Sequence, residues 1–167
     1  MSLRRDSQIN RCKKCFVHKD DCYCDQIHPF RLETKVSIIM FKKERWLPSN
    51  TAMLTQNSLL NSEISLRGYA DSKITESFLD EENYQPLFLY PDADAEELTP
   101  EFLSTFDQPI NLVVPDGTWR QAKKIHTREK SVSHIKKVKL TTSPKTIYPL
   151  RRQKYEYGLC THEAIAY

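Results

Sequence analysis

The sequence predicts an α/β fold, with a mainly parallel sheet covered by helices and a small cysteine-rich arm in front of it. Short apolar runs typical of buried strands alternate with helix-like stretches along the 167 residues. This alternation favours a parallel sheet with helices on both faces. The chain length suits one domain with a small appendage. We therefore expect an arm at residues 1–30 and an α/β domain at residues 31–167.

Five elements are expected in the first half of the chain. The strands are short runs rich in β-branched and aromatic residues, whereas the helices carry apolar residues at helical spacing. Pro48-Ser49-Asn50-Thr51 opens the first helix, with Asn50 or Ser49 as its N-cap. In order, the expected elements are a strand at 35–41, a helix toward Leu60, a strand at 64–67, a helix at 72–79 and a strand at 86–90.

The second half is expected to continue the alternation. The acidic stretches between the apolar runs at 86–90 and 110–114 are predicted to be helical. The basic stretch after the second run is predicted to form a further helix. Near the carboxyl end, Gly158 and then Thr161 as a cap precede a short helix that carries Glu163 in its first turn. Before this, the expected elements are helices at 94–98 and 100–106, a strand at 110–114, a helix at 118–129 and a strand at 135–140.

Residues 112–119, Leu-Val-Val-Pro-Asp-Gly-Thr-Trp, are the most informative stretch. They place Asp116 and Gly117 at the carboxyl end of a strand, where open α/β sheets bind ligands. An ordinary β-turn capped by Thr118 is the alternative, because Pro-Asp-Gly is common turn chemistry. The chain has three glycines, and Gly117 suits close approach of the backbone to a ligand. No G-x-G-x-x-G or Walker A motif occurs, which argues against a Rossmann dinucleotide site and a P-loop NTPase.

The charges are strongly segregated along the chain. Residues 120–154 hold twelve Lys or Arg and one acid, whereas residues 71–107 hold eleven acids and one base. This pattern favours a polyanion-binding face opposed by an acidic back, and solvated surface without a partner is the alternative. Aromatic residues within or beside the basic block suit base stacking, so RNA is the expected partner. They are Trp119, Tyr148, Tyr155 and Tyr157.

Four of the five cysteines fall within thirteen residues, in the pattern C-x2-C-x6-C-x-C. A C-x2-C knuckle supplies two corners of a tetrahedral zinc site, and the C-x-C pair can supply the other two. Disulfides are the alternative, with His18 and His28 as reserve ligands. Four thiolates leave no open position, so zinc here would be structural. The expected ligands are Cys12, Cys15, Cys22 and Cys24.

The sequence shows no apolar run near the length of a membrane span and no signal-peptide core. We therefore expect a cytoplasmic protein without a membrane partner.

Five motifs in this order resemble the DTW-domain family, the tRNA-uridine aminocarboxypropyltransferases, which are related to SPOUT enzymes. They are the cysteine arm, Pro48-Ser49-Asn50-Thr51, Asp116-Gly117-Thr118-Trp119, Tyr148-x-Leu150-Arg151 and Leu159-Cys160-Thr161-His162-Glu163-Ala164. The resemblance implies a SPOUT-like fold, in which a carboxyl-terminal trefoil knot forms the S-adenosylmethionine (SAM) pocket. Members of the family usually continue past the position of Tyr167, so we expect this chain to lack a tail.

The resemblance also implies the reaction: SAM donates its 3-amino-3-carboxypropyl group to N3 of a uridine in tRNA, and methylthioadenosine is released. Asp116 is expected to act as the base or to orient the uracil, Trp119 to stack on a base, and Arg151 to pair with a carboxylate or phosphate. A zinc-braced RNA-binding module without catalysis and a SPOUT-type RNA methyltransferase are the alternatives.

The remaining expected site residues form two sets. The SAM pocket is expected to be lined by Leu89, Tyr90, Val113, Gly117, Thr118, Leu150, Leu159, Thr161 and Glu163. The tRNA backbone is expected to contact Arg120, Lys123, Lys124, Arg128 and Arg152. For Trp119 and Leu150, packing in the core is the alternative.

Overall fold

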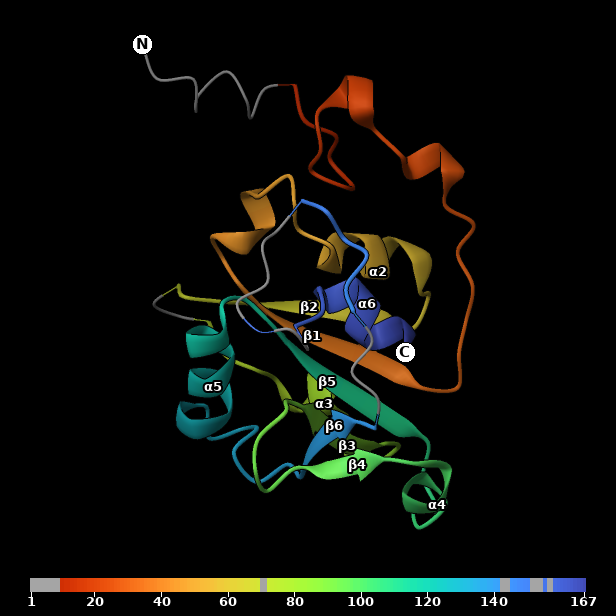
Figure 1. Cartoon of the computed structure of the whole chain (residues 1–167), viewed down its shortest axis with the longest axis vertical. Coiled ribbons are helices and arrows are strands. Elements are labelled where there is room, and N and C mark those ends of the chain that lie inside the picture. The colour runs from red at the N-terminus through yellow and green to blue at the C-terminus, as the bar shows by residue number, and fades with distance from the viewer. Residues whose placement is uncertain (1–9, 70–71, 142–144, 151–154, 156–157) are drawn as a thin grey trace.

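The computed structural model shows a six-stranded parallel sheet with helices on both faces (Figure 1). It describes residues 10–69, 72–141, 145–150, 155 and 158–167. The strand order is β2-β1-β5-β3-β6-β4, and every adjacent pair is parallel. The expected α/β class with a mainly parallel sheet is therefore confirmed.

The strands and helices alternate along the chain. The strands are β1 (Lys35–Phe41), β2 (Ser62–Arg67), β3 (Gln85–Leu89), β4 (Glu96–Leu98), β5 (Ile110–Asp116) and β6 (Lys137–Leu140). The α-helices are α2 (Ala52–Ser58), α3 (Glu76–Leu79), α4 (Pro100–Leu103), α5 (Trp119–Arg128) and α6 (Thr161–Ala166). Three 3-10 turns complete the set: η1 (Lys19–Asp21), η2 (Cys24–Gln26) and η3 (Glu44–Trp46).

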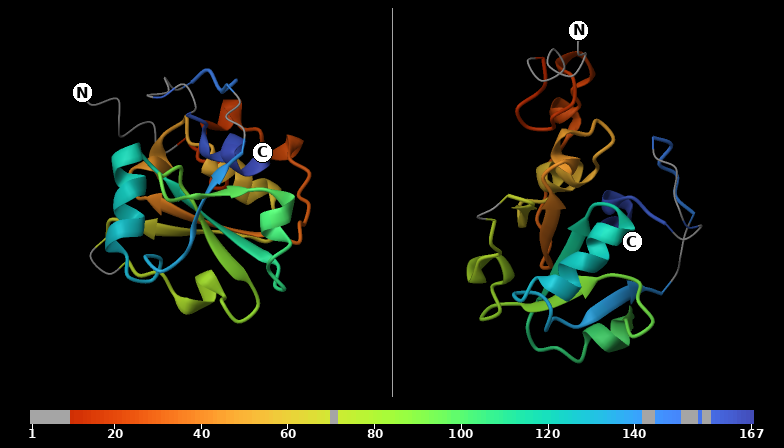
Figure 2. Two further views of the ribbon diagram at one scale, coloured as in Figure 1. Left: turned by 60° about the horizontal axis from the view of Figure 1, so that its bottom comes forward. Right: turned by 90° about the vertical axis from the view of Figure 1, so that its left-hand side faces the viewer.

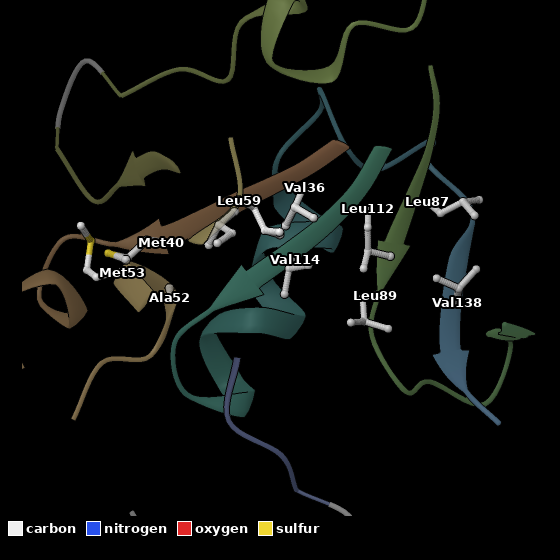
Figure 3. Packing of buried hydrophobic residues seen from close by; sticks show 11 residues of the cluster. Val36, Met40, Ala52, Met53, Leu59, Leu87, Leu89, Leu112, Val114 and Val138 are labelled. Carbon is white, nitrogen blue, oxygen red and sulfur yellow. The ribbon is translucent and has the colours of Figure 1, made fainter. Parts of the chain in front are cut away.

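Alternate residues of the central strands enter two separate cores, because successive side chains of a strand point to opposite faces. On one face, Val36 and Met40 of β1 pack with Leu112 of β5 beneath α2 (Figure 3). On the other face, Ile39 and Val113 pack with α3 and α5. The central strands are buried on both faces, which explains their nearly continuous apolar sequences.

The sheet register brings the carboxyl ends of β1, β2 and β5 to one edge. Met40 lies opposite both Leu66 of β2 and Asp116 of β5. The segments that leave this edge are η3, the residues after β2, and α5 (Figures 1 and 2). Every residue that the sequence places just after β1, β2 or β5 therefore lies along the same side of the molecule.

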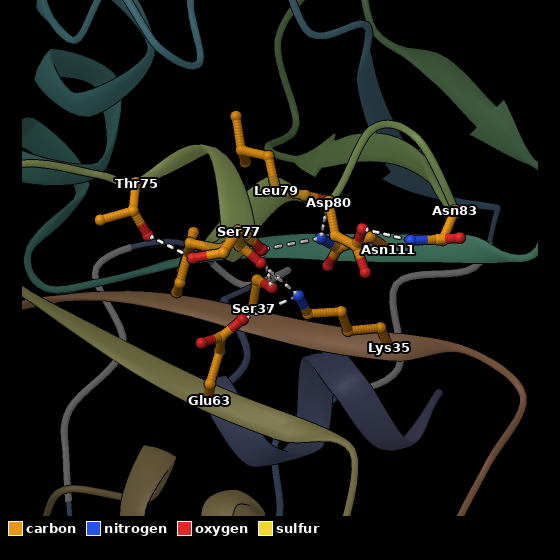
Figure 4. A network of polar contacts seen from close by, with 10 residues as sticks. Lys35, Ser37, Glu63, Thr75, Ser77, Leu79, Asp80, Asn83 and Asn111 are labelled. Carbon is orange, nitrogen blue, oxygen red and sulfur yellow. Dashed lines mark hydrogen bonds and ion pairs between the residues drawn. The ribbon is translucent and has the colours of Figure 1, made fainter.

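The opposite, amino-terminal edge of the sheet carries a compact polar network (Figure 4). Asn111, which is fully buried, donates hydrogen bonds to the carbonyls of Phe78 (3.2 Å) and Leu79 (2.7 Å). Ser37 Oγ donates to the Phe78 carbonyl, and Lys35 Nζ pairs with Glu63 at 2.8 Å. These contacts satisfy the carbonyl groups at the end of α3 and hold the short helix on the sheet.

Several predicted elements need correction. Residues 94–98 were expected to be helical, but Glu96–Leu98 forms β4, because it pairs with the basic strand β6. The helix expected at 72–79 is limited to Glu76–Leu79, and the helix expected at 100–106 to Pro100–Leu103. Thr51 is the residue that precedes α2, but the capping hydrogen bond expected of Asn50 is present, because its Oδ1 accepts from the N–H of Met53. The N-cap of α6 is Cys160, where Thr161 was expected. The predicted carboxyl-terminal knot stays a prediction, because residues 142–144, 151–154 and 156–157 lie outside the described residues.

None of the helices in the described part of the chain has the length and apolarity needed to cross a bilayer.

Candidate functional site

Asp116 forms the centre of the carboxyl edge and joins three segments of the chain. Its side chain is buried, with 3% of its surface exposed. Asn50 Nδ2 donates a hydrogen bond to Asp116 Oδ2 at 2.8 Å, and Thr161 Oγ1 donates one to Oδ1 at 2.5 Å. Asp116 therefore connects β5 with the loop before α2 and with the first turn of α6.

The loop before α2 is held by the same group of contacts. Asn50 Oδ1 accepts a hydrogen bond from the backbone N–H of Met53, so Asn50 satisfies the start of α2 while its amide binds Asp116. Thr51 Oγ1 accepts from the N–H of His162, and Thr55 Oγ1 lies 2.9 Å from His162 Nδ1. Burial lowers the pKa of His162, which favours the neutral imidazole in this contact. The starts of α2 and α6 are thus fixed to each other.

Glu163 connects α6 to the segment around residue 147. Its carboxylate accepts hydrogen bonds from the backbone N–H groups of Cys160 (2.9 Å) and Ile147 (2.8 Å) and from Thr146 Oγ1 (2.7 Å). Burial acts to raise the pKa of Glu163, but these hydrogen bonds outweigh it and lower the pKa to about 2. With Cys160 Sγ accepting from the Glu163 N–H, the two residues form a capping box.

An aromatic group lies beside Asp116 at the start of α5. The Trp119 ring makes edge contacts with Tyr90 and Tyr155, with ring centroids 6.0 Å and 5.3 Å away. Trp119 is half-buried, so this ring is neither a core side chain nor fully exposed. The three rings bring together β5–α5, the end of β3 and the residue at 155.

The Gly117-Thr118 turn starts α5 through a capping box with Gln121. Thr118 Oγ1 accepts the N–H of Gln121, and Gln121 Oε1 accepts the N–H of Thr118. A Cβ built on Gly117 would lie 3.0 Å from Gln121 Oε1 and 3.3 Å from a carbon of the Phe41 ring. The need for glycine is therefore explained by packing against Gln121 and Phe41, not only by the ligand approach expected from sequence.

The four arm cysteines converge on one point. Their sulfur atoms all lie within 4.8 Å of one another, with Sγ···Sγ distances of 3.8 Å for Cys12–Cys24 and for Cys15–Cys22. These separations are too long for disulfides. A tetrahedral zinc with Zn–S bonds of about 2.3 Å has sulfur–sulfur edges of roughly 3.8 Å. The backbone N–H groups of Cys15 and Lys14 lower the pKa of Cys12 to about 6, whereas burial raises the pKa of Cys15 and of Cys24. The fit to a metal therefore rests on the positions of the four sulfur atoms.

The arm docks on η3, which follows β1. Phe16, at the tip of the knuckle, packs edge-on against Trp46 at 5.4 Å, and the guanidinium of Arg45 lies 4.5 Å from the Phe16 ring. Arg11 Nη1 donates hydrogen bonds to the carbonyls of Phe16 (2.8 Å) and Trp46 (3.2 Å). The arm that holds the cysteine cluster is therefore in contact with η3, and the loop after η3 contains Asn50, which binds Asp116.

The DTW domain family matches residues 9–167, which is nearly the whole chain. The chain belongs to the DTW domain family. The match covers the arm, the Asp116 junction and the start of α6, so the segments that the structure brings together all lie within the family's domain.

Named relatives agree with this assignment. The chain is 29% identical to a protein of Macaca fascicularis named tRNA-uridine aminocarboxypropyltransferase 2. The two align over 163 residues, which is 93% of this chain and 54% of the relative. A protein of the same name from Drosophila melanogaster is 29% identical over 94% of this chain and 64% of its own length. The chain thus spans about half to two thirds of these relatives. No solved structure matches it.

The residues expected to line the SAM pocket of this DTW domain divide into three groups. Tyr90, Gly117, Leu159, Thr161 and Glu163 are half-buried and Thr118 is exposed, all beside the Asp116 junction or the Trp119 ring group. Leu89 and Val113 are buried, and their side chains belong to the two cores. Leu150 is 66% exposed, so the alternative that it packs in the core is wrong. Arg151 and Arg152 lie outside the described residues.

The expected RNA-binding residues of the DTW domain that are described lie on α5. Arg120, Lys123 and Arg128 are exposed, Lys124 is half-buried, and the helix has no acid in its first turn. The basic block is not uniformly available, however. Lys137 pairs with Asp92 and Asp94, and Lys139 with Glu97. The cations of β6 are therefore compensated by the acidic segment, and α5 carries the cationic surface beside Asp116.

The sequence predicted Asp116 and Thr161 as site residues. It did not predict the hydrogen bonds of Thr55 and His162 to each other or of Thr146 to Glu163. The motif Pro48-Ser49-Asn50-Thr51 indicated that Asn50 caps a helix, but it did not indicate that Asn50 also binds Asp116. A hollow of about 460 Å³ at the opposite edge, lined by residues that precede β1, β3 and β5, contains none of the motif residues. The candidate site is therefore the carboxyl edge around Asp116.

Proposed function

We propose that this chain is a SAM-dependent tRNA-uridine aminocarboxypropyltransferase, with its active site at the carboxyl edge of the sheet. The observation that carries the proposal is the Asp116 junction, because it gathers three of the family's motifs around one buried carboxylate. The names of the relatives support the same activity.

In the proposed reaction, N3 of a uridine attacks the Cγ of the methionine moiety of SAM. The N3–Cγ bond forms while the Cγ–S bond breaks, the N3 proton leaves, and the sulfur departs as methylthioadenosine. The uracil N3–H is a weak acid, so a hydrogen-bond acceptor near it favours attack. A carboxylate at the strand end also attracts the sulfonium cation.

Asp116 is proposed to supply this negative charge. Both of its oxygens already accept hydrogen bonds, from Asn50 and Thr161. These donors fix the carboxylate in one orientation, which favours a role in orienting the uracil or the sulfonium over free movement as a proton carrier. Trp119, which makes T-shaped contacts with Tyr90 and Tyr155, is proposed as the ring on which the uracil or the adenine stacks.

Two further groups complete the proposal. The four arm thiolates fit a structural zinc ion, which would close the knuckle and hold it against η3; with all four positions taken by protein, it performs no chemistry. The cations of α5 are proposed to contact the tRNA backbone, contributing affinity but no sequence information. Arg151 and Arg152 stay predicted contacts for a carboxylate or phosphate.

Product analysis tests the proposal. The chain is incubated with SAM and an unmodified tRNA transcript, and both the small molecules and the digested nucleosides are examined by mass spectrometry. Methylthioadenosine together with an aminocarboxypropylated uridine is the expected result. S-adenosylhomocysteine with a methylated nucleoside would indicate a methyltransferase instead, and RNA binding without either product would indicate a non-catalytic module.

A further inference from the structure

The loop after β1 and the turn after β2 carry a second group of cations and aromatic rings to which the proposed function gives no RNA contact, although Arg45 and Trp46 also pack against Phe16 of the arm. Trp46 is 40% exposed and Tyr69 is 52% exposed, which is unusual for large rings beside a site. The ammonium group of Lys42 lies 4.8 Å from the centre of the Tyr69 ring, and Arg45 lies 5.7 Å from that of Trp46. Each exposed ring therefore has a cation beside it.

The local backbone holds Lys42 and Tyr69 together. The N–H of Lys42 donates to the Arg67 carbonyl, which extends the β1–β2 pairing by one residue. Gly68, with φ of +97°, turns the chain after β2, and the Lys42 side chain lies 3.6 Å from the position of a Cβ there. Glycine is favoured here by its positive φ, since a Cβ would make only ordinary contacts with the Lys42 stem, and the turn places the Tyr69 ring beside the Lys42 ammonium group.

The charges of this loop are also one-sided. Lys42, Lys43 and Arg45 are accompanied by one acid, Glu44, which is buried with 7% of its surface exposed. Lys43 itself is exposed. Lys42 and Arg45 are half-buried, so the loop presents one fully and two partly exposed cations while it buries its acid, a composition that suits a surface for a polyanion with stacked bases.

This surface lies at the same edge of the sheet as α5, and Arg67 at the end of β2 pairs with Glu129 just after α5. In the register, Phe41 lies opposite Arg67, and a Cβ built on Gly117 would lie 3.3 Å from the Phe41 ring. Figure 2 (right) shows η3, the segment after β2 and α5 arranged around the carboxyl edge. The cations of α5, the Asp116 junction and the residues after β1 and β2 therefore lie along the same edge of the sheet.

We infer that Lys42, Lys43, Arg45, Trp46 and Tyr69 form a second RNA contact surface, which binds unpaired nucleotides next to the target uridine. The inference deepens the proposed function and rests on it, since it assigns the neighbouring nucleotides of the same substrate. Tyr69 and Trp46 take bases by stacking, while the three cations contact phosphates.

A lysine over a tyrosine does not by itself indicate RNA, and the chain provides a matched control. At the amino edge, Lys35 lies 5.9 Å from the Tyr84 ring centre, but Lys35 is also paired with Glu63 and donates to the Ser77 carbonyl. At the amino edge, the lysine of this Lys–Tyr pair is therefore held by contacts within the protein. Tyr84→Ala removes an equivalent ring far from the proposed surface.

The test measures binding of the full chain, without SAM, to a fluorescent oligouridylate and to an unmodified tRNA transcript. Tyr69→Ala should weaken oligouridylate binding by roughly fivefold or more, the scale for losing one stacked base, and Tyr69→Phe should restore it. Lys43→Ala should reduce the slope of log affinity against log salt by about one for one lost phosphate contact. Tyr84→Ala should change neither quantity.

The outcomes separate this inference from the proposed function. Unchanged affinity in Tyr69→Ala, an equal loss in Tyr84→Ala, or failure of the unaltered chain to bind either RNA overturns the second surface, even where the product assay detects transfer. A loss confined to Tyr69→Ala and Lys43→Ala supports the surface, even where no transfer product is formed.

Discussion

The two ends of strand β5 use buried polar side chains in different ways. At the amino end, Asn111 donates to two backbone carbonyls of the adjacent helix end. At the carboxyl end, Asp116 accepts from the side chains of Asn50 and Thr161. Backbone partners are fixed by the fold, whereas side-chain partners can rotate or exchange for a ligand without unfolding the sheet. The comparison fits an amino edge that serves stability and supports the proposal that the carboxyl edge serves binding.

The largest expected effect is at the carboxyl edge. Asp116→Asn keeps the size of the side chain and still allows hydrogen bonds to Asn50 and Thr161, but it removes the charge. Transfer should fall by roughly a hundredfold, the scale for losing a preorganised group that stabilises charge in the transition state. Single-turnover measurement of modified uridine would show it.

Thr161→Val is the matched control for that variant, because it removes one hydrogen bond and leaves the carboxylate. It should reduce transfer far less than Asp116→Asn does. Equal, small losses in both variants would make Asp116 a structural clamp and would remove the functional half of the comparison between the two edges.

Metal removal is expected to act on one edge alone. The arm contacts η3 through Phe16, Arg11 and Arg45, but no described arm contact reaches α3. A chelator should therefore increase hydrogen exchange at residues 10–26 and 44–51 while leaving 76–79 protected. Elemental analysis should give one zinc per chain, and Cys22→Ser should reproduce the effect. An unchanged exchange pattern after confirmed zinc loss would contradict the coupling.

A variant of the amino edge should show the reverse behaviour. Asn111→Ala removes the side-chain donor to the Leu79 carbonyl and leaves the Phe78 carbonyl with Ser37 alone, and should lower the free energy of unfolding by about 1–3 kcal/mol. Chemical denaturation measures this change. SAM affinity of the folded protein should stay unchanged, and a selective loss of affinity would show that the two edges are not separate in function.

The smallest expected effect concerns pH. Glu163 has its pKa lowered from 4.5 to about 2 in the folded chain. Its stabilising contribution is therefore present above the unfolded value of 4.5 and is lost as pH falls from 4.5 toward 2. Thermal unfolding from pH 6 to pH 3 should show a steeper loss in the unaltered chain than in Glu163→Gln. Parallel curves would mean that other carboxylates account for acid sensitivity.

The core strands could be predicted from sequence almost to the residue, because β1, β3 and β5 are apolar runs that are buried on both faces. Strand β4 could not. Its sequence, Glu-Glu-Leu, is acidic and short, and only pairing with the lysines of β6 makes it a strand. Local sequence does not contain that partner.

The candidate site was predictable in part. The strand end at Asp116 and the tetrahedral cysteine set follow from local spacing. The burial of Asp116 does not, since its partners Asn50 and Thr161 lie 66 and 45 residues away in sequence. The exposure of Leu150 likewise depends on packing that a short motif cannot show.

The same sequence separations have a kinetic consequence. Contacts between distant segments form only after the loops between them have closed, and that closure is slow when the loops are long. The Asp116 junction needs β1, α2, β5 and α6 in place, so it is expected to assemble after the folding transition state. Substitutions at Asn50 or Thr161 should then leave the refolding rate nearly unchanged and accelerate unfolding. The candidate site would be the last part of this domain to form and the first to open.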